Sequence, residues 1–135
     1  MRRNIIVGLL LWHEGPLYSS VKKVRTTANK LKIALPESLE TVYNKYFLTY
    51  EETPKNTIAI MNVSVLLEYR GKGVGKKMLK AFCDSHNKEM ELCVLKQNIV
   101  AIRLYESIGF RIVSERDGFS LKDDKPRCFD MRRKI

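Results

Sequence analysis

The apolar positions change their period along the first third of the chain, and each period predicts a different element. Residues 5–12 are apolar throughout and include β-branched side chains, which predicts a strand buried on both faces. Gly15 and Pro16 end this strand. From Leu17 to Leu35 the apolar residues recur at steps of four and three, which predicts a helix with one apolar face.

A second helix is expected directly after the first. Pro36 breaks the first helix, and together with Glu37 it suits the first turn of the next one. Apolar and aromatic residues continue the helical spacing up to Tyr50, and we expect them to pack in the core. Residues 53–56 then predict a turn.

The second half of the chain predicts alternating strands and helices. The predicted order is strand, helix, strand, helix, strand, strand, over residues 57–67, 76–87, 91–95, 98–108, 110–115 and 128–135. Gly109 stands just past the second of these helices, where a left-handed conformation is needed. This order predicts an α/β fold.

Length and cysteine content bear on the number of domains, on metal binding and on the cellular compartment. The chain of 135 residues suits a single domain over residues 1–135. Its three cysteines are an odd number at no metal-like spacing, so we expect no metal site. Cys83 and Cys93 fall within apolar patterns, which predicts buried, reduced thiols and a cytoplasmic protein.

The formal net charge of +10 is spread along the chain and is not gathered in a tail. Such a surface attracts nucleic acid, an anionic membrane or a polyanionic cofactor. The apolar run at residues 5–12 is too short to span a bilayer and is followed by no small-residue cleavage site. We therefore expect no membrane partner, and nucleic-acid binding remains the less favoured interpretation of the charge.

A glycine loop between a predicted strand and a predicted helix carries the clearest chemistry. Gly71, Gly73 and Gly75 allow backbone amides to converge on an anion at the start of the helix. Four basic side chains lie in or beside the loop: Arg70, Lys72, Lys76 and Lys77. Together they predict a pyrophosphate site, although glycine spacing alone is equally consistent with a bare structural turn.

Two other phosphate-binding loops fail on spacing. A Walker loop needs Ser or Thr after Gly-Lys, but Gly75-Lys76 is followed by Lys77. A dinucleotide loop needs Gly-x-Gly-x-x-Gly, whereas the glycines here stand at every second position.

Two motifs in the second half of the chain point to one family. Residues 70–75 match the pattern Arg/Gln-x-x-Gly-x-Gly/Ala, directly after a strand and Tyr69. Residues 98–110 match Asn-x-x-Ala-x-x-Leu-Tyr-x-x-x-Gly-Phe, and residues 130–135 are similar to a closing strand. In these features the chain resembles the GCN5-related N-acetyltransferases, and the resemblance covers residues 57–135.

The resemblance implies both a fold and an activity. It implies a mixed, mainly antiparallel central sheet flanked by helices, with a helical segment before the central CoA-binding strand. Residues 57–135 would form the CoA-binding core, and residues 1–56 a divergent strand plus helices. The implied reaction transfers an acetyl group from acetyl-CoA to the amine of a small molecule or peptide by direct attack.

The resemblance also implies roles for particular residues. The backbone around Val63, Ser64 and Val65 would pair with the pantetheine arm, and an amide there would polarise the thioester carbonyl. Asn98 would contact the pantetheine, and Tyr105 would protonate the departing thiolate. The pyrophosphate would lie on Arg70, Gly71, Lys72, Gly73, Val74, Gly75 and Lys76. From the residues alone, Asn98 also suits a helix N-cap and Tyr105 a packing position.

The first part of the chain departs from the family. Members usually begin with a strand and two helices over the acceptor site, so we interpret this chain as an N-terminally shortened or divergent member. A partner subunit, as in a homodimer, is one way to complete the fold. No general base is assigned: we expect Glu68 to be solvated, and His13, Glu51 and Glu52 are weak candidates. The alternatives are a non-catalytic CoA-binding or regulatory module and a basic nucleic-acid-binding protein.

Overall fold

The computed structural model describes residues 4–15, 21–34, 53–118 and 126–135. Within these residues, five strands form one sheet in the order β1-β2-β3-β5-β4. The strands are β1 (Gly8–Glu14), β2 (Thr57–Val65), β3 (Glu89–Leu95), β4 (Arg111–Asp117) and β5 (Arg127–Arg133). Only the pairing of β2 with β3 is parallel, and the three other pairings are antiparallel. The prediction of a mixed, mainly antiparallel sheet is confirmed.

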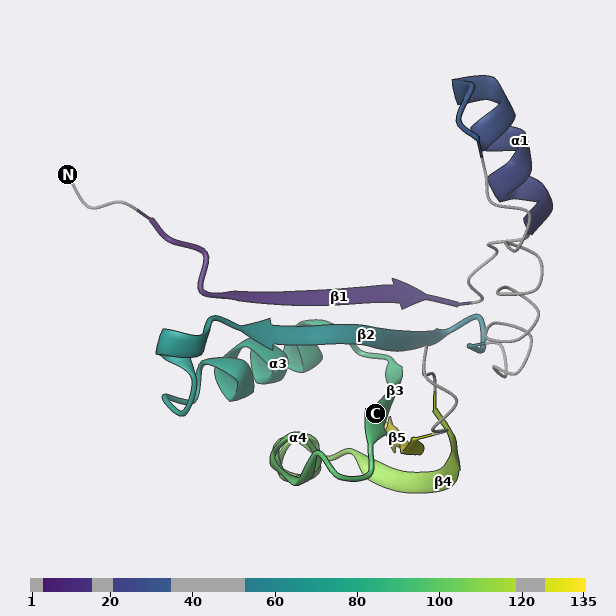
Figure 1. The fold of residues 1–135 in the computed structure, drawn as a ribbon. Helices are drawn as coiled ribbons and strands as arrows, with labels where there is room; N and C mark the ends of the chain where they lie inside the picture. The colour runs from purple at the N-terminus through teal and green to yellow at the C-terminus, as the bar shows by residue number, and fades with distance from the viewer. Residues whose placement is uncertain (1–3, 16–20, 35–52, 119–125) are drawn as a thin grey trace.

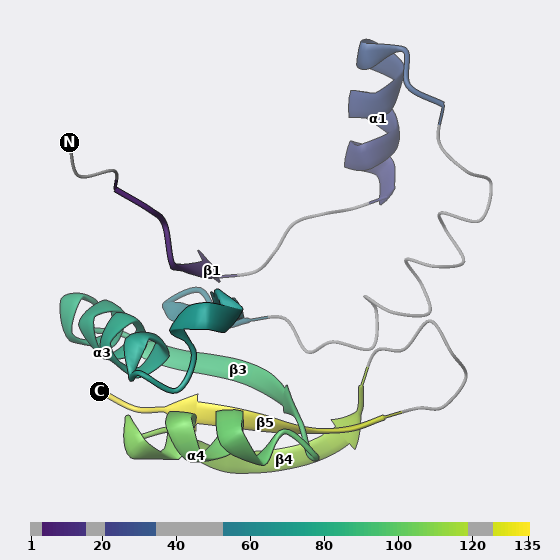
Figure 2. The same ribbon diagram turned by 60° about the vertical axis from the view of Figure 1, so that its left-hand side comes forward.

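In the described residues, three α-helices accompany the sheet: α1 (Val21–Leu31), α3 (Val74–Ser85) and α4 (Ile99–Ser107). A short 3-10 helix, Leu67–Tyr69, follows β2. Figures 1 and 2 show α3 beside β2, α4 beside β4 and β5, and α1 standing apart from the sheet. Helix α1 confirms the helical segment before β2, while the second predicted helix, at residues 36–50, lies outside the described residues. No helix in the described ranges is long and apolar enough to cross a lipid bilayer.

The core lies between the sheet and helices α3 and α4. It is built by alternation, because Met90, Leu92 and Val94 of β3 all point to the same side and are buried. The largest fully buried side chains are Phe110, Ile58, Leu79, Met90 and Met131. We call the side of the sheet that α3 and α4 cover the helical face, and the opposite side the far face.

Strand β1 differs from the prediction in its start and in its burial. It begins at Gly8, not at residue 5, and it forms an edge of the sheet. The side chains of Leu9 and Leu11 are 52% and 49% exposed, so the predicted burial on both faces is wrong. The uninterrupted apolar run gave no sign of an edge position, which depends on which strands pair with β1.

Cys93 also differs from the prediction. Cys83 is buried as expected, but Cys93 is exposed, and all three cysteines are free thiols. The cause is the alternation of β3: because Leu92 and Val94 point to the helical face, Cys93 points to the far face.

An aromatic cluster seats β1 on α3. The ring of Trp12 lies 5.4 Å from the ring of Phe82 and 5.2 Å from that of His86, measured between centroids. Phe82 and His86 are themselves 4.3 Å apart. These contacts hold the last turn of α3 against the C-terminal half of β1.

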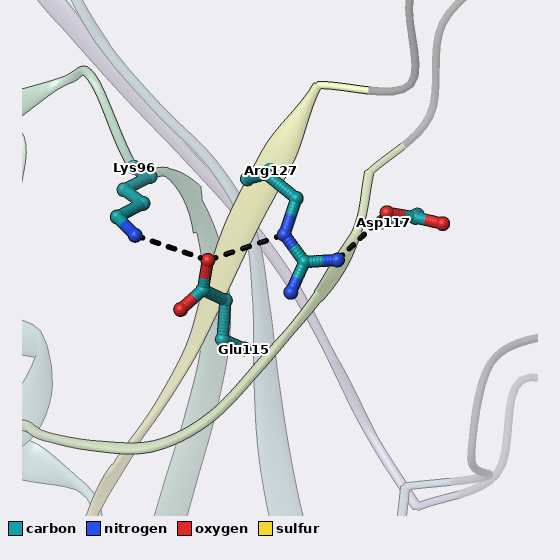
Figure 3. A network of polar contacts seen from close by, with 4 residues as sticks. All are labelled: Lys96, Glu115, Asp117 and Arg127. Carbon is teal, nitrogen blue, oxygen red and sulfur yellow. Dashed lines mark hydrogen bonds and ion pairs between the residues drawn. The ribbon is translucent and has the colours of Figure 1, made fainter.

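The ends of β4 and β5 carry a network of charged side chains, shown in Figure 3. The carboxylate of Glu115 accepts hydrogen bonds from Lys96 and Arg127, both at 3.1 Å. Arg127 also donates to Asp117 at 2.7 Å. The hydrogen bonds from Lys96 and Arg127 hold the pKa of Glu115 below its ordinary value of 4.5.

Candidate active site

The glycine loop adopts the conformation that its sequence requires. Gly71 and Gly73 have φ angles of 73° and 76°, in the left-handed region that favours glycine. A Cβ atom at either position would meet nothing within 4 Å, so the space around the loop is open. The positive φ angle, and not crowding by neighbouring atoms, is therefore the reason that these two positions favour glycine.

Helix α3 begins directly at this loop. Gly73 is its N-cap and makes no side-chain cap hydrogen bond, and the first turn holds no acidic residue. The first amide groups of a helix have no partner within it, so those of residues 74–76 remain available to an anion. Lys76 and Lys77 of the first turn are exposed and add positive charge.

Strands β2 and β3 separate beside the loop. Their parallel pairing runs from Thr57 with Glu89 to Ile60 with Leu92 and ends there. Beyond that point β3 continues to pair with β5, and β2 continues to pair with β1. The side of residues 61–65 that is turned toward β3 is thus left without a strand partner, and we call it the open edge of β2.

The backbone of Val63 and Val65 faces the open edge. The amide of Leu66 donates to the carbonyl of Val7 at 2.9 Å, so Leu66 points its N–H toward the β1 side. Because peptide groups alternate along an antiparallel strand, Ser64 also points toward β1. The N–H and C=O groups of Val63 and Val65 therefore point the other way. The sequence predicted that the backbone of residues 63–65 would pair with the pantetheine arm. The backbone of Ser64 already pairs with β1, so only Val63 and Val65 have N–H and C=O groups that face the open edge.

Arg70 reaches back from the loop to this edge. Its Nε atom donates a hydrogen bond to the carbonyl oxygen of Val65 at 2.8 Å. This contact joins the first residue of the glycine loop to the last residue of β2. From the sequence, Arg70 was predicted only to bind phosphate. Its hydrogen bond to Val65 could not be predicted, because a contact between a side chain and a backbone carbonyl leaves no sequence pattern.

Helix α4 lies against the start of α3. A Cβ atom at Gly75 would stand 3.6 Å from Val65 and 3.8 Å from Leu104, so β2, α3 and α4 meet at this glycine. Asn98 caps α4 by accepting a hydrogen bond from the amide of Ala101 at 3.2 Å. The N-cap interpretation of Asn98 is therefore confirmed.

Tyr105 stands on α4 one position after Leu104. It packs partly buried against the core, with its ring 6.0 Å from that of Phe110 in an edge-to-face arrangement. Burial raises the pKa of its hydroxyl above the ordinary value of 10.0. The hydroxyl therefore stays protonated at neutral pH, as a proton donor must.

Among the weak candidates for a general base, the structure describes His13, which pairs with Ala59 and so lies outside the open edge. His13 is on β1, where its Nδ1 atom lies 2.9 Å from the carbonyl oxygen of Gly15. Glu68 is exposed, as expected, and Glu51 and Glu52 lie outside the described residues. The part of the chain that the structure describes contains no cluster of metal-ligating side chains.

The described site thus consists of a glycine loop at the start of a helix, beside two strands that separate. Comparison with known proteins identifies the class. The sequence profile of the acetyltransferase (GNAT) domain matches residues 41–112, more than half of the chain. The chain belongs to the GNAT acetyltransferase family.

Individual relatives agree with this assignment. The spermine/spermidine N(1)-acetyltransferase of Bacillus subtilis (strain 168) is 40% identical over 78 residues, which cover 53% of this chain and 51% of the relative. The chain spans about half the length of the curated relatives it matches.

Two solved structures share the fold. An N-acetyltransferase from Staphylococcus aureus Mu50 matches with a TM-score of 0.63 and 18% identity, over 98% of this chain and 66% of that one. The yncA protein of Salmonella typhimurium, solved with its cofactor acetyl-CoA, matches with a TM-score of 0.53 and 25% identity, over 58% and 48%. The predicted GNAT-like fold is confirmed.

Proposed function

We propose that this chain binds acetyl-CoA along the glycine loop and the open edge of β2, and that it transfers the acetyl group to a primary amine. The observation that carries the proposal is the separation of β2 from β3 beside a loop that begins a helix. An extended arm with amide groups suits an unpaired strand edge, and a pyrophosphate suits the loop. Acetyl-CoA joins these two parts in one molecule.

The loop would hold the pyrophosphate. The amides of residues 74–76, in the first turn of α3, have no partner within the helix. The space around Gly71 and Gly73 is open, because a Cβ atom at either position would meet nothing within 4 Å. The exposed side chains of Lys72 and Lys76 add positive charge to this surface. Backbone amides and positive charge together favour a doubly charged anion over a neutral ligand.

The open edge would hold the pantetheine arm and the thioester. The amides of Val63 and Val65 point to this edge and can donate to the arm as a neighbouring strand would. A thioester carbonyl that accepts from one of them gains charge stabilisation as its oxygen becomes negative during attack. Bound acetyl-CoA supplies the thioester whose acetyl group is transferred.

Tyr105 would protonate the leaving group. The amine nitrogen attacks the thioester carbonyl carbon, the carbon–sulfur bond breaks, and the sulfur takes the proton of the Tyr105 hydroxyl. The raised pKa of Tyr105 keeps that proton in place until the thiolate forms. The proton that the amine loses passes to water, and the tyrosinate is reprotonated from solvent.

Thermal unfolding with equal concentrations of acetyl-CoA, CoA, ATP and NAD tests the binding site. A ligand at 100 times its dissociation constant adds about 2.7 kcal/mol to the free energy of unfolding. We expect acetyl-CoA and CoA to raise the melting temperature by several degrees, and ATP and NAD to raise it much less. Equal shifts with all four ligands would indicate a generic phosphate site and contradict the proposal.

Kinetics of the Tyr105→Phe variant test the chemistry. The variant keeps the ring and its contact with Phe110 but loses the acid, so turnover should fall about 100-fold or more while CoA affinity stays unchanged. Tyr69→Phe is the matched control, because it removes a hydroxyl from the short 3-10 helix before the loop. Equal rates for the two variants would remove Tyr105 from the mechanism.

A second candidate function is a CoA-binding module without catalysis. It is favoured by one observation, that His13, a candidate general base, pairs with Ala59 and so lies outside the open edge of β2. The two functions differ in outcome: the module shows a thermal shift with CoA but no acetylation of spermidine, lysine or alkylamines at any enzyme concentration.

A further inference from the structure

The pairing of β1 with β2 is interrupted at the place where the open edge begins. Leu11 pairs with Asn62, but the next residue, Trp12, pairs with Ile60, so Met61 is an extra residue in β2. Such a bulge changes the face to which the following side chains point. Beyond it Val63 packs on the core, and the side chains of Asn62 and Ser64 stand on the far face.

Asn62 and Ser64 form a hydrogen-bonded pair on that face. The Ser64 hydroxyl donates to Oδ1 of Asn62, and both side chains are exposed. A hydroxyl has one proton and two lone pairs. Because its proton is committed to Asn62, Ser64 presents only its lone pairs to the surroundings. In this arrangement Ser64 Oγ is an acceptor for an N–H group.

Two leucines frame the pair. Leu9 is paired with Ser64 and Leu11 with Asn62, so the four side chains share the far face. The leucines are 52% and 49% exposed. The surface beside the polar pair is therefore aliphatic.

The two faces of the open edge offer different approaches to a thioester held there. The helical face is covered at Val65 by the start of α3, since a Cβ at Gly75 would be 3.6 Å from that side chain. The far face presents the exposed pair of Asn62 and Ser64. Ser64 is the residue between Val63 and Val65, whose amides border the edge. A nucleophile that approaches from the far face passes Ser64 Oγ.

We propose that Ser64 Oγ binds the acceptor amine, that Asn62 positions Ser64, and that Leu9 and Leu11 contact an aliphatic chain carrying the amine. This inference rests on the proposed acetyltransferase function. The amine donates one N–H to Ser64 Oγ, which leaves its nitrogen lone pair directed to the thioester carbonyl. Ser64 contacts substrate, whereas Asn62 is a positioning residue.

Steady-state kinetics with ethylamine and hexylamine test the proposal. Ser64→Ala should raise KM for both amines about tenfold, the effect of losing one hydrogen bond, and leave the thermal shift with acetyl-CoA unchanged. Asn62→Ala should show a smaller loss, and Ser64→Thr, which keeps the hydroxyl, should recover most of the wild-type KM. Leu11→Ser should reduce the preference for hexylamine over ethylamine. Asn87→Ala, an exposed asparagine beyond the end of α3, is the matched control.

A binding experiment separates this inference from the proposed function. A conjugate that joins hexylamine through an acetyl group to the sulfur of CoA should raise the melting temperature of the wild type more than acetyl-CoA does. In Ser64→Ala and Leu11→Ser this extra shift should shrink. An unchanged extra shift in both variants, or none in the wild type, overturns the placement of the amine even if acetyl-CoA binds. Failure of CoA and the conjugate to bind at all overturns both proposals.

Discussion

Replacing Gly73 by alanine isolates the cost of one backbone conformation. Gly73 has φ 76° and ψ 10° at the N-cap of α3, and a Cβ atom there would meet nothing within 4 Å. The substitution therefore introduces no clash, and only the torsion angle opposes it. Most glycine substitutions combine both effects, so this position permits a clean measurement.

The magnitude follows from two opposing terms. A left-handed conformation costs an L-residue roughly 1–2 kcal/mol. Alanine also lowers the entropy of the unfolded chain relative to glycine. This effect raises the free energy of unfolding by about 0.4–1 kcal/mol. We expect Gly73→Ala to lower the free energy of unfolding by about 1 kcal/mol, or roughly 3 °C in Tm for a domain of this size.

Urea denaturation followed by far-ultraviolet circular dichroism is the assay, with Gly75→Ala as the control. Gly75 has an ordinary φ, and its Cβ would make normal contacts at 3.6 and 3.8 Å. Because alanine favours helices over glycine by about 1 kcal/mol, this control should be neutral or stabilising. Gly73→Asn should cost less than Gly73→Ala, since asparagine tolerates the left-handed region. Equal losses for Gly73→Ala and Gly75→Ala would refute the reasoning.

Three further predictions concern stability. Asn98→Ala removes the cap of α4 and should cost about 1 kcal/mol in urea denaturation, whereas Asn98→Asp should cost little; equal losses would contradict a capping role. Phe110→Ala, at a fully buried position, should cost about 3–5 kcal/mol in the same assay, and a loss below 1 kcal/mol would contradict its place in the core. The pKa of Glu115 is lowered by folding, so its ion pairs stabilise the protein above the ordinary value of 4.5 and lose this effect as the pH falls through the folded value. Glu115→Gln should therefore lower Tm at neutral pH, and this difference should shrink as the pH falls below 4.5; a pH-independent difference would contradict the network.

Local features of the structure could be predicted from the sequence because each has a local cause. Gly109 has φ 102°, as its place after a helix indicated, and Asn98 caps the helix that it precedes. The turn before β2 is closed by the amide of Thr57, which donates to Pro54 at 2.9 Å. In each case the residues that determine the conformation are neighbours in the chain.

Features that depend on strand pairing could not be predicted in this way. The bulge at Met61 arises from the register of β1 on β2, and no pattern within β2 encodes it. The exposure of β1 follows from its place at the edge of the sheet. Cys93 is a different case, because the alternation of Met90, Leu92 and Val94 was present in the sequence and implied the opposite face.

The aromatic cluster between β1 and α3 gives the protein a built-in optical reporter. Trp12 is the only tryptophan in the sequence, and its ring lies against Phe82 and His86. Its fluorescence therefore reports whether β1 is packed against α3, and no added label is needed. If the emission spectrum shifts at a lower urea concentration than the circular dichroism signal, then β1 detaches before the rest of the sheet unfolds. Coincident curves would show that the edge strand and the core unfold as one cooperative unit.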